Sequence, residues 1–489
     1  MLFNSHIFML LFLPLLLAGW YFLNWKKKFQ LAQGYLIGMS LWFYAYANLQ
    51  YLWLLLFSCL IGWLLSCLPE KISSEKGKKV LTGVGCVFHL GLLGYFKYSN
   101  FFLENLNTVF HTDFPMLQIL LPVGISFYTF QQLAYLIDRC RGDAPRDSFF
   151  DYLTFMVYFP QLLQGPILLR SEFMGQLKEP ERRRFHAERF SEGIQFFVFG
   201  LAKKVLLADT LAKAVNYGYS NVSMLDSISA LLLAVGYLTE LYFDFSGYCD
   251  MAVGLGKMIG LEVAENFDAP FHSASVKEFW RRWHMTLGRF FTRYVYIPLG
   301  GNRRGKMRTL CNVMIVMLLS GLWHGAAWTF VLWGFLHGAG MIWDNLEHPH
   351  LPKKWMRQAA TFAYVCMTFV FFRAESIAQG VDVLRSIVSL KWNGFVFQMA
   401  SALDMTECYI ITKALSMKLP GLLSWFWLGI FVVLIAICFR VLSGKKVSGV
   451  VALQKQKGYG RLYPVLLAVL FTWSMISMTG VSEYLYFSF

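Results

Sequence analysis

Apolar residues recur along this chain in runs long enough to cross a membrane. The clearest runs are Ile7–Trp25, Leu49–Leu68, Val80–Phe102, Leu422–Phe439 and Leu462–Met478. A helix rises by about 1.5 Å per residue, so each run can span a hydrocarbon core of about 30 Å. Because backbone polar groups in lipid must be satisfied within a helix, the pattern predicts an all-α, polytopic integral membrane protein with about 10–12 transmembrane helices.

The first run is a candidate for a processed leader as well as for a span. It is about twice as long as the apolar core of a signal peptide. It also lacks a basic start and a small-residue cleavage site. We therefore expect Ile7–Trp25 to be a retained span.

Basic clusters predict how the chain is oriented in the membrane. By the positive-inside rule, the loops that carry them are expected to be cytoplasmic. The clusters are Lys26–Lys28, Lys71–Lys79, Arg139–Arg146, Arg170–Arg189, Lys277–Lys306 and Lys445–Arg461. Two helices fit between the first two clusters. The segment Glu104–Pro115 has acids but no Lys or Arg, so it is expected to lie outside together with the N-terminus.

Composition agrees with a membrane protein and argues against other classes. The 489 residues are 57% hydrophobic and only 15% charged, which leaves too few polar side chains for the surface of a soluble protein. The net charge of +15 lies beside apolar runs, where anionic lipid headgroups explain it, so no nucleic-acid partner is expected. The nine cysteines are scattered and form no CxxC pair, so neither a zinc site nor a disulfide framework is expected.

No internal repeat or long linker divides the chain, so residues 1–489 are expected to form one integral membrane domain. Residues 1–115 are expected to form N-terminal spans that serve as a scaffold, and residues 346–489 are expected to form ordinary C-terminal spans. Residues 116–345 predict the core that carries chemistry, because Gly, Pro, His, Asp and Arg interrupt their apolar stretches. Irregular backbone at membrane depth must be covered by protein or line a wet cavity, so MVYFPQLLQGPI (156–167) predicts a re-entrant hairpin.

The stretch SGLWHGAAWTF places an ionisable ring, His324, in an expected helix from Ser320 to Trp343. The helix carries two small-xxx-small pairs, at Gly321 and Gly325 and at Gly334 and Gly338. Such pairs predict close approach of a neighbouring helix. An ionisable group in a span is costly and is a candidate functional residue, but a structural histidine that hydrogen-bonds a neighbouring helix fits this pattern equally well.

A metal site on this helix can be tested by spacing. His337 lies thirteen residues beyond His324, which is about 20 Å along one continuous helix. The two rings would then be too far apart to share a metal ion. We therefore expect no metal, and we interpret His337 as an interfacial or structural residue.

Residues 277–306, KEFWRRWHMTLGRFFTRYVYIPLGGNRRGK, combine aromatic residues and arginines at helical spacing. They predict an amphipathic helix at the cytoplasmic interface, followed by a Pro–Gly–Gly turn. One interpretation is a plain membrane-surface helix. In the other, His284 with Arg281, Arg282 and Arg289 lines the mouth of a pocket for an anionic, phosphate-bearing donor.

Leu241–Phe271 contains Asp244 and Asp250 among aromatic and small residues. These carboxylates are candidate acid–base or binding groups, although buried partners of nearby arginines and helix caps are commoner roles. Gly254 and Gly256 do not indicate a nucleotide-binding loop, because no strand precedes them.

Several longer motifs occur in a fixed order. They are LPVGISFYTFQQLAYLID, YFPQLLQGPI, FDFSGYCDMAVGLG, ENFDAPF, FWRRWHMTLGRF, YVYIPLGGNRRG, GLWHGAAWTFVLWG and the terminal EYLYFSF. Together they resemble the membrane-bound O-acyltransferase (MBOAT) family, in its bacterial alginate O-acetylation branch. The resemblance is strongest from Leu121 to Asn345, and ILLRSEF after QGPI is the weaker match.

The resemblance implies an acyltransferase that moves an acyl group from a thioester to a hydroxyl. The essential histidine of the WHG motif matches His324, and the second histidine, in the WRRWH motif, matches His284. The bacterial branch implies acetyl-CoA as a cytosolic donor substrate, with no bound cofactor. It also implies an extracytoplasmic SGNH-type transferase as partner, a polysaccharide acceptor and the bacterial inner membrane as location.

The residues suit that chemistry. A hydroxyl is a poor nucleophile at neutral pH, and a neutral imidazole at His324 can take its proton as it attacks the thioester carbonyl. Burial disfavours the charged imidazole and keeps it available as a base. Trp323 and Trp328 are expected to wall the site and to exclude water that would hydrolyse the thioester.

Three alternatives stay open. D-alanyl transfer to teichoic acid would replace acetyl-CoA by the thioester of a phosphopantetheine carrier protein. A membrane transporter would use His324 in a proton relay, although the sequence lacks the paired broken-helix halves of inverted repeats. A non-catalytic assembly scaffold would tolerate substitution of His324.

Overall fold

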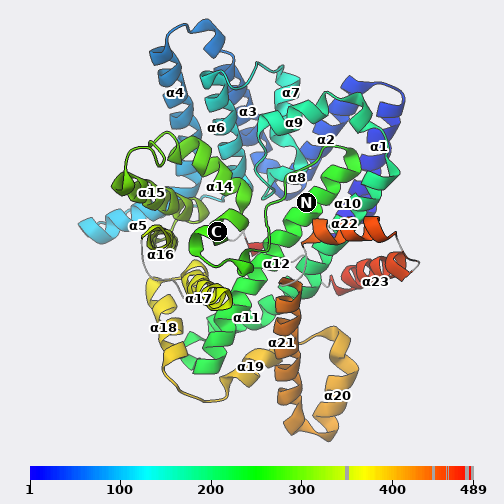
Figure 1. Cartoon of the computed structure of the whole chain (residues 1–489), viewed down its shortest axis with the longest axis vertical. Coiled ribbons are helices and arrows are strands. Elements are labelled where there is room, and N and C mark those ends of the chain that lie inside the picture. The colour runs from blue at the N-terminus through cyan, green and yellow to red at the C-terminus, as the bar shows by residue number, and fades with distance from the viewer. Residues whose placement is uncertain (347–351, 443–445, 459, 461, 479–483, 486–489) are drawn as a thin grey trace. The chain divides into compact units, whose positions relative to one another are not determined.

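The structure is a computed structural model that describes residues 1–346, 352–442, 446–458, 460, 462–478 and 484–485. Throughout these residues the regular structure is helical and no strand forms (Figure 1). Most of EYLYFSF lies outside the described residues, as do both ends of the basic cluster Lys445–Arg461. The prediction of an all-helical membrane protein is confirmed.

Six stretches of described helix are long and apolar enough to cross a membrane. They are Phe8–Trp25, Leu49–Lys71, Glu75–Phe110, Ser227–Ile259, Lys306–His324 and Pro420–Val441. Four of the five runs seen in the sequence are among them, and the fifth forms the shorter apolar helix α23 (Leu462–Ser477). The larger number of spans expected from the sequence stays a prediction.

The described residues fold as two compact units, each assembled from separate stretches of chain. Unit 1 comprises Met1–Val198, Tyr248–Asn266 and Thr286–Pro298, and unit 2 comprises Phe199–Gly247, Phe267–Met285 and Leu299–Phe489. The long helix α12 (Ser227–Ile259) contributes residues to both units. The sequence predicted a scaffold (1–115), a core that carries chemistry (116–345) and C-terminal spans (346–489). That division is by role and not by compactness, and it stays a prediction.

Unit 1 begins with apolar helices that pack against one another. α1 (Leu13–Trp25) packs on α2 (Phe29–Asn48), and α4 (Glu75–Leu93) packs on α6 (Ile125–Arg141). α3 (Leu52–Ser66) lies beside both α4 and α6 (Figure 1). α2 and α3 are the two helices predicted between the first two basic clusters, and α5 (Ser99–Phe110) follows α4 through the π-helical turn Gly94–Tyr98.

The segment expected to form a re-entrant hairpin is broken and buried. α7 (Phe149–Val157) and the single turn α8 (Phe159–Leu162) lead into irregular backbone before α9 (Arg170–Leu177), and every residue from 152 to 169 is buried. The irregular backbone is thus covered by protein, as predicted. Whether the hairpin re-enters a membrane stays a prediction.

α10 (Ala187–Ala202) packs against the last turns of α12. A Cβ built on Gly254 would lie 2.5 Å from the Gly193 carbonyl oxygen, and one on Gly193 would lie 2.6 Å from the Gly254 carbonyl oxygen. Only glycine allows two backbones to approach this closely. Gly254 therefore serves helix packing, which agrees with the rejection of a nucleotide loop.

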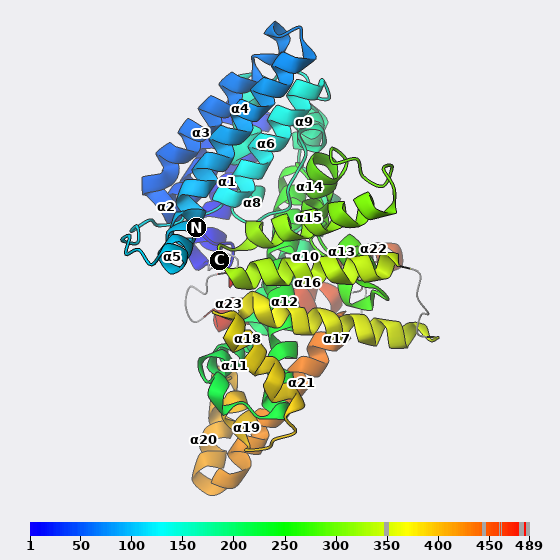
Figure 2. The same cartoon turned by 90° about the vertical axis from the view of Figure 1, so that its left-hand side faces the viewer.

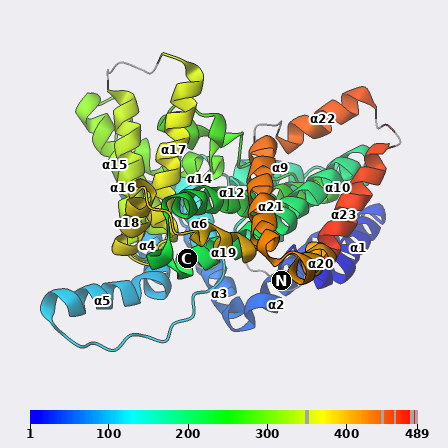
Figure 3. The ribbon, with the colours of Figure 1, turned by 90° about the horizontal axis from the view of Figure 1, so that it is seen from below.

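Unit 2 is built around α15 (Lys306–His324), α16 (Trp328–Asn345) and α17 (Lys354–Arg373), which lie side by side (Figures 2 and 3). α17 also packs on α18 (Ile377–Val388), and α19 (Phe395–Ser401) packs on α21 (Pro420–Leu442). The remaining helices are α11 (Asp209–Ser220), α13 (Val276–Arg282), α20 (Tyr409–Lys418) and α22 (Val447–Lys457). The π-helical turn η6 (Lys203–Ala208) precedes α11.

Candidate active site

The helix expected from Ser320 to Trp343 is two helices, so that prediction is wrong. α15 ends at His324, the backbone is extended at Gly325 and Ala327, and α16 starts at Trp328. The chain reverses at this break, and α15 and α16 pack along each other (Figure 2). His324 consequently lies at the end of a helix beside a turn, not in the middle of a span.

The glycine pairs produce the close approach that the sequence predicted. A Cβ on Gly321 would lie 2.3 Å from the Phe330 carbonyl oxygen, and one on Gly334 would lie 2.5 Å from the Met317 carbonyl oxygen. Real Cβ atoms essentially never come so close to backbone. The neighbouring helix is therefore the other half of the same stretch, because Gly321 lies on α15 and Gly334 on α16, whereas Gly325 lies in the turn beyond the end of α15.

Substitution of Gly321 by alanine is expected to destabilise this hairpin. The added methyl group would meet backbone that cannot turn aside as a flexible side chain would, and overpacking of this kind costs about 1–3 kcal/mol. Gly429→Ala on α21 is the matched control, because nothing lies within 4 Å of its Cβ position. Thermal unfolding in detergent should show a lower Tm for Gly321→Ala only. Equal Tm values for the two variants would contradict the packing argument.

The structure brings the two candidate histidines together. His284 and His324 are both buried, with 0% and 3% of their surface exposed, and their ring centroids are 6.4 Å apart. Trp323 packs against both rings, with centroids 6.1 Å from His284 and 4.9 Å from His324. Phe245 of α12 packs edge-on against His284, with a centroid separation of 4.8 Å. The pair thus sits in an aromatic enclosure within unit 2.

His284 interrupts the helix that was expected to continue through the WRRWH motif. α13 ends at Arg282 and α14 (Met285–Phe291) starts after His284, whose φ of 46° is left-handed. A non-glycine residue held in this region costs about 1–3 kcal/mol and is found preferentially at functional sites. Burial lowers the pKa of His284 to about 3, so its imidazole is neutral at ordinary pH. The expected turn follows, with positive φ at Gly300 and Gly301.

His337 lies much nearer to His324 than a continuous helix would allow, so the expected separation of about 20 Å is wrong. The Trp333 ring lies between the two, with centroids 5.2 Å from His324 and 4.8 Å from His337. His337 is fully buried, where its Nδ1 accepts a hydrogen bond from Trp280 at 3.2 Å and its Nε2 lies 2.9 Å from the Thr368 hydroxyl. Both of its ring nitrogens thus contact side chains of neighbouring helices, as expected of a structural residue. The described residues contain no group of three side chains able to hold a metal ion.

Asp244 is buried in an ion pair, but its partner is a lysine that the sequence reasoning missed. Lys204 Nζ lies 2.6 Å from Asp244 Oδ1 and 2.8 Å from Asp209 Oδ1, and the Leu485 amide donates to Asp244 Oδ2 at 3.1 Å. Burial opposes the charge of Lys204, but Asp244 and Asp209 outweigh it and raise its pKa above the ordinary value. A lysine pair within the apolar stretch FVFGLAKKVLLA was the signal that could have identified it.

The remaining candidate residues of unit 2 lie at more open positions. Arg281 is exposed, and Arg282 pairs with Glu278 of its own helix at 2.8 Å. Trp328 is the first residue of α16 and is 56% exposed, whereas Trp323 is buried against the histidines. The donor-binding role of these arginines and the walling role of Trp328 stay predictions.

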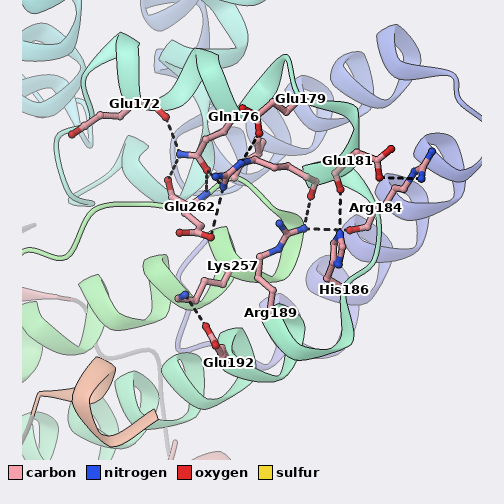
Figure 4. Close-up of polar contacts among 12 residues, drawn as sticks. Glu172, Gln176, Glu179, Glu181, Arg184, His186, Arg189, Glu192, Lys257 and Glu262 are labelled. Carbon is pink, nitrogen blue, oxygen red and sulfur yellow. Dashed lines mark hydrogen bonds and ion pairs between the residues drawn. The ribbon is translucent and has the colours of Figure 1, made fainter. Parts of the chain in front are cut away.

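Arg289 lies in unit 1, where its partner Glu172 belongs to the polar network shown in Figure 4. Its guanidinium pairs with the Glu172 carboxylate and donates to the Ile167 carbonyl oxygen at 3.0 Å. In the same network the Glu262 amide donates to Gln176 Oε1 at 2.7 Å. The charge of Arg289 is thus already balanced by a carboxylate, and its predicted contact with a donor is untested.

A cavity of about 720 Å³ opens in unit 2. Phe330 and Phe372 form part of its wall, with ring centroids 4.9 Å apart. The Phe372 ring also packs on the His324 ring, with a centroid separation of 5.2 Å. Phe372 therefore both lines the cavity and contacts His324, and the cavity volume suits a small ligand.

Comparison with known proteins places this site within a recognised group. Residues 146–380, which include both histidines, match the model of the membrane-bound O-acyltransferase family. The chain is similar to a peptidoglycan O-acetyltransferase from Helicobacter pylori, with 35% identity over 80% of each chain. It is also similar to a probable alginate O-acetylase AlgI from Azotobacter vinelandii, with 39% identity over 77% of this chain and 76% of the relative. A teichoic acid D-alanyltransferase from Streptococcus thermophilus is 28% identical over 49% of this chain and 58% of its own.

Proposed function

Because this chain belongs to the membrane-bound O-acyltransferase family, we propose that it moves an acetyl group from a cytosolic thioester across the membrane for O-acetylation of an extracytoplasmic polysaccharide. The chain is an acyltransferase. The choice of acetyl is supported by the relatives named as O-acetylating, which are 35% and 39% identical over more than three quarters of this chain. The D-alanyltransferase is similar over only 49% of it.

The observation that carries the proposal is the buried pair of His284 and His324 in its aromatic enclosure. In the proposed reaction the oxygen of an acceptor hydroxyl attacks the thioester carbonyl carbon while His324 takes the hydroxyl proton. The carbon–sulfur bond then breaks, and the proton returns to the leaving thiolate. His284, neutral at ordinary pH, supplies one donor or acceptor nitrogen to position the reacting groups.

The aromatic enclosure supports this role for His324 on physical grounds. Trp323, Trp333 and Phe372 each pack against its ring, so little water reaches it. Exclusion of water protects a thioester from hydrolysis and favours the neutral imidazole that a general base requires. His324 is also the last residue of α15, so no further helical turn follows it.

The donor, partner and location belong to the same proposal. We take acetyl-CoA as the donor substrate, an SGNH-type extracytoplasmic transferase as the partner and the bacterial inner membrane as the location. The names of the relatives support acetyl as the transferred group and a glycan as its destination, the family supports a membrane location, and the exposed Arg281 suits a phosphate-bearing donor. D-alanyl transfer from a carrier-protein thioester is the competing acyl chemistry, favoured by the similarity to the Streptococcus enzyme.

The two acyl chemistries can be separated with a labelled donor. Membranes that contain the chain and its envelope acceptors would receive either acetyl-CoA labelled in the acetyl group or a carrier protein loaded with labelled D-alanine. We expect alkali-labile label in the envelope glycan from acetyl-CoA only, and none from membranes that lack the chain. Label from the D-alanyl carrier alone would overturn the choice of acetyl, and equal label without the chain would overturn the proposed function.

A further inference from the structure

The left-handed turn at His284 needs support from the chain around it. A residue other than glycine keeps a φ of 46° only where the surrounding structure holds it there. The loop 265–269 contacts the chain on both sides of this turn. The loop belongs to the motif ENFDAPF (265–271), which the proposed reaction leaves without a role.

On the side before His284, the loop holds the end of α13. The Asp268 amide donates a hydrogen bond to the Arg282 carbonyl oxygen at 2.9 Å, and the Arg282 guanidinium donates to the Asp268 carbonyl oxygen at 3.3 Å. The Phe267 ring packs edge-on against the Trp283 ring, with a centroid separation of 5.1 Å. Asp268 takes part through its backbone, so this half of the support depends little on the side chain at position 268.

On the side after His284, the contact is made by a side chain. Asn266 Oδ1 accepts two hydrogen bonds from Thr286, one from its amide at 3.1 Å and one from its hydroxyl at 3.0 Å. Both residues are buried. Thr286 lies in the first turn of α14, where backbone N–H groups have no acceptor within the helix, so the Asn266 oxygen supplies the missing one. Alanine at position 266 would remove this acceptor from a buried amide.

The Thr286 hydroxyl also fastens α14 to the buried hairpin. It accepts a hydrogen bond from the Ile167 amide at 3.1 Å, and Arg289 of the same helix donates to the Ile167 carbonyl oxygen at 3.0 Å. Asn266, Thr286 and Ile167 thus form a chain of buried hydrogen bonds. Because only one residue separates His284 from Thr286, a fixed Thr286 restricts where the His284 ring can lie.

We propose that Asn266 is a positioning residue for His284. By holding Thr286 it maintains the left-handed turn, and the turn places the His284 ring 6.4 Å from the His324 ring inside the aromatic enclosure. This inference rests on the proposed acyl transfer, in which His284 positions the reacting groups. It adds the residue that sets the place of His284 itself, and catalytic groups work only when a supporting shell holds them in this way.

The position of the His284 ring can be followed without an acyl donor. The purified full chain in nanodiscs would carry histidine labelled with ¹³C at Cε1, and the His284 signal in an NMR spectrum would be identified by its loss in His284→Gln. We expect Asn266→Ala to shift or broaden this signal, because the ring then changes its contacts with the Phe245 and Trp323 rings. Asn266→Asp should restore the wild-type signal, since its carboxylate can accept the same two hydrogen bonds.

Asn24→Ala is the matched control for a general loss of stability. Asn24 is also a buried asparagine, and its side chain donates to the Trp20 carbonyl oxygen of its own helix α1 at 2.7 Å. The His284 signal of this variant should stay as in the wild type. An unchanged His284 signal in Asn266→Ala, or an equal change in Asn24→Ala, would overturn the inference.

The labelled-donor experiment gives a second readout. Asn266→Ala should lower kcat per folded protein about 10- to 100-fold at an unchanged KM for acetyl-CoA, because a displacement of about 1 Å in a positioned group has an effect of this size. Asn266→Asp should recover most of the rate, and Asn24→Ala should keep it. A wild-type kcat in Asn266→Ala would contradict the positioning role.

Thr286 provides a second pair of variants if Asn266→Ala does not fold. Thr286→Val keeps the shape of the side chain but removes the hydroxyl that joins Asn266 to Ile167, whereas Thr286→Ser retains it. We expect the His284 signal to change in Thr286→Val and to stay in Thr286→Ser. Identical signals in the two variants would overturn the inference.

Failure of this inference can be told apart from failure of the proposed function. A wild-type chain that transfers no acetyl group would contradict the proposed function, while the NMR comparison would still show whether Asn266 sets the place of His284. Normal transfer by both the wild type and Asn266→Ala would contradict the positioning role alone.

Discussion

Cells that carry His324→Ala are expected to lose O-acetyl ester from their cell-surface glycan by at least about 100-fold, because general base catalysis contributes a factor of about 10²–10⁴. Alanine cannot take the hydroxyl proton, and the His284 ring does not occupy the same position, because its centroid is 6.4 Å from that of His324. The measurement is alkali-released acetate per cell, with the membrane abundance of the protein determined in the same samples.

Two further variants separate catalysis from structure. His324→Asn retains a polar side chain but is not a base, so it should lose as much ester as alanine does. His186→Ala replaces an exposed histidine whose Nε2 lies 3.3 Å from the Glu181 carbonyl oxygen (Figure 4), and it should keep full activity. Ester retained in His324→Ala at normal abundance would contradict a catalytic role and would favour the scaffold alternative.

Lys204→Met is expected to produce the largest loss of stability. The substitution leaves Asp244 and Asp209 without the ammonium group that lies 2.6 and 2.8 Å from them, and removal of one partner of a buried ion pair costs about 3–5 kcal/mol. The free energy of unfolding in detergent, measured by denaturant titration, should fall by an amount in this range.

Two further variants test this prediction: one is a control at an exposed ion pair, and the other removes a carboxylate that Lys204→Met leaves unpaired. Lys78→Met removes an exposed ion pair with Glu75, whose side chain is 79% exposed, and should change the free energy of unfolding by less than about 1 kcal/mol. Adding Asp244→Leu to Lys204→Met removes the more deeply buried of the two uncompensated carboxylates, because the Asp244 side chain is 2% exposed and that of Asp209 is 24% exposed, and it should restore most of the loss. Equal effects of Lys204→Met and Lys78→Met would show that the buried pair does not stabilise the fold.

Sequence patterns predicted the helices and the candidate chemistry of this protein. Runs of apolar residues are a local property, so their positions were sufficient to predict the helices that begin at Phe8, Glu75 and Pro420. The motif positions of His284 and His324 singled out both residues, and the glycine pairs correctly predicted a close helix contact. Each of these inferences depends on residues near one another in the chain.

The tertiary structure alone decided where those residues lie. Helical periodicity is the same whether a chain continues or reverses, so the break at Gly325 and the approach of His337 to His324 could not be predicted from spacing. The position of Asp244 in an apolar stretch indicated that the carboxylate would need a cationic partner. Only the packing of η6 against α12 determined that this partner is Lys204 and not an arginine. Propensity and periodicity act over a few residues, whereas the partner of a buried side chain is set by contacts between distant segments, which is why the residues of the site were predictable and its geometry was not.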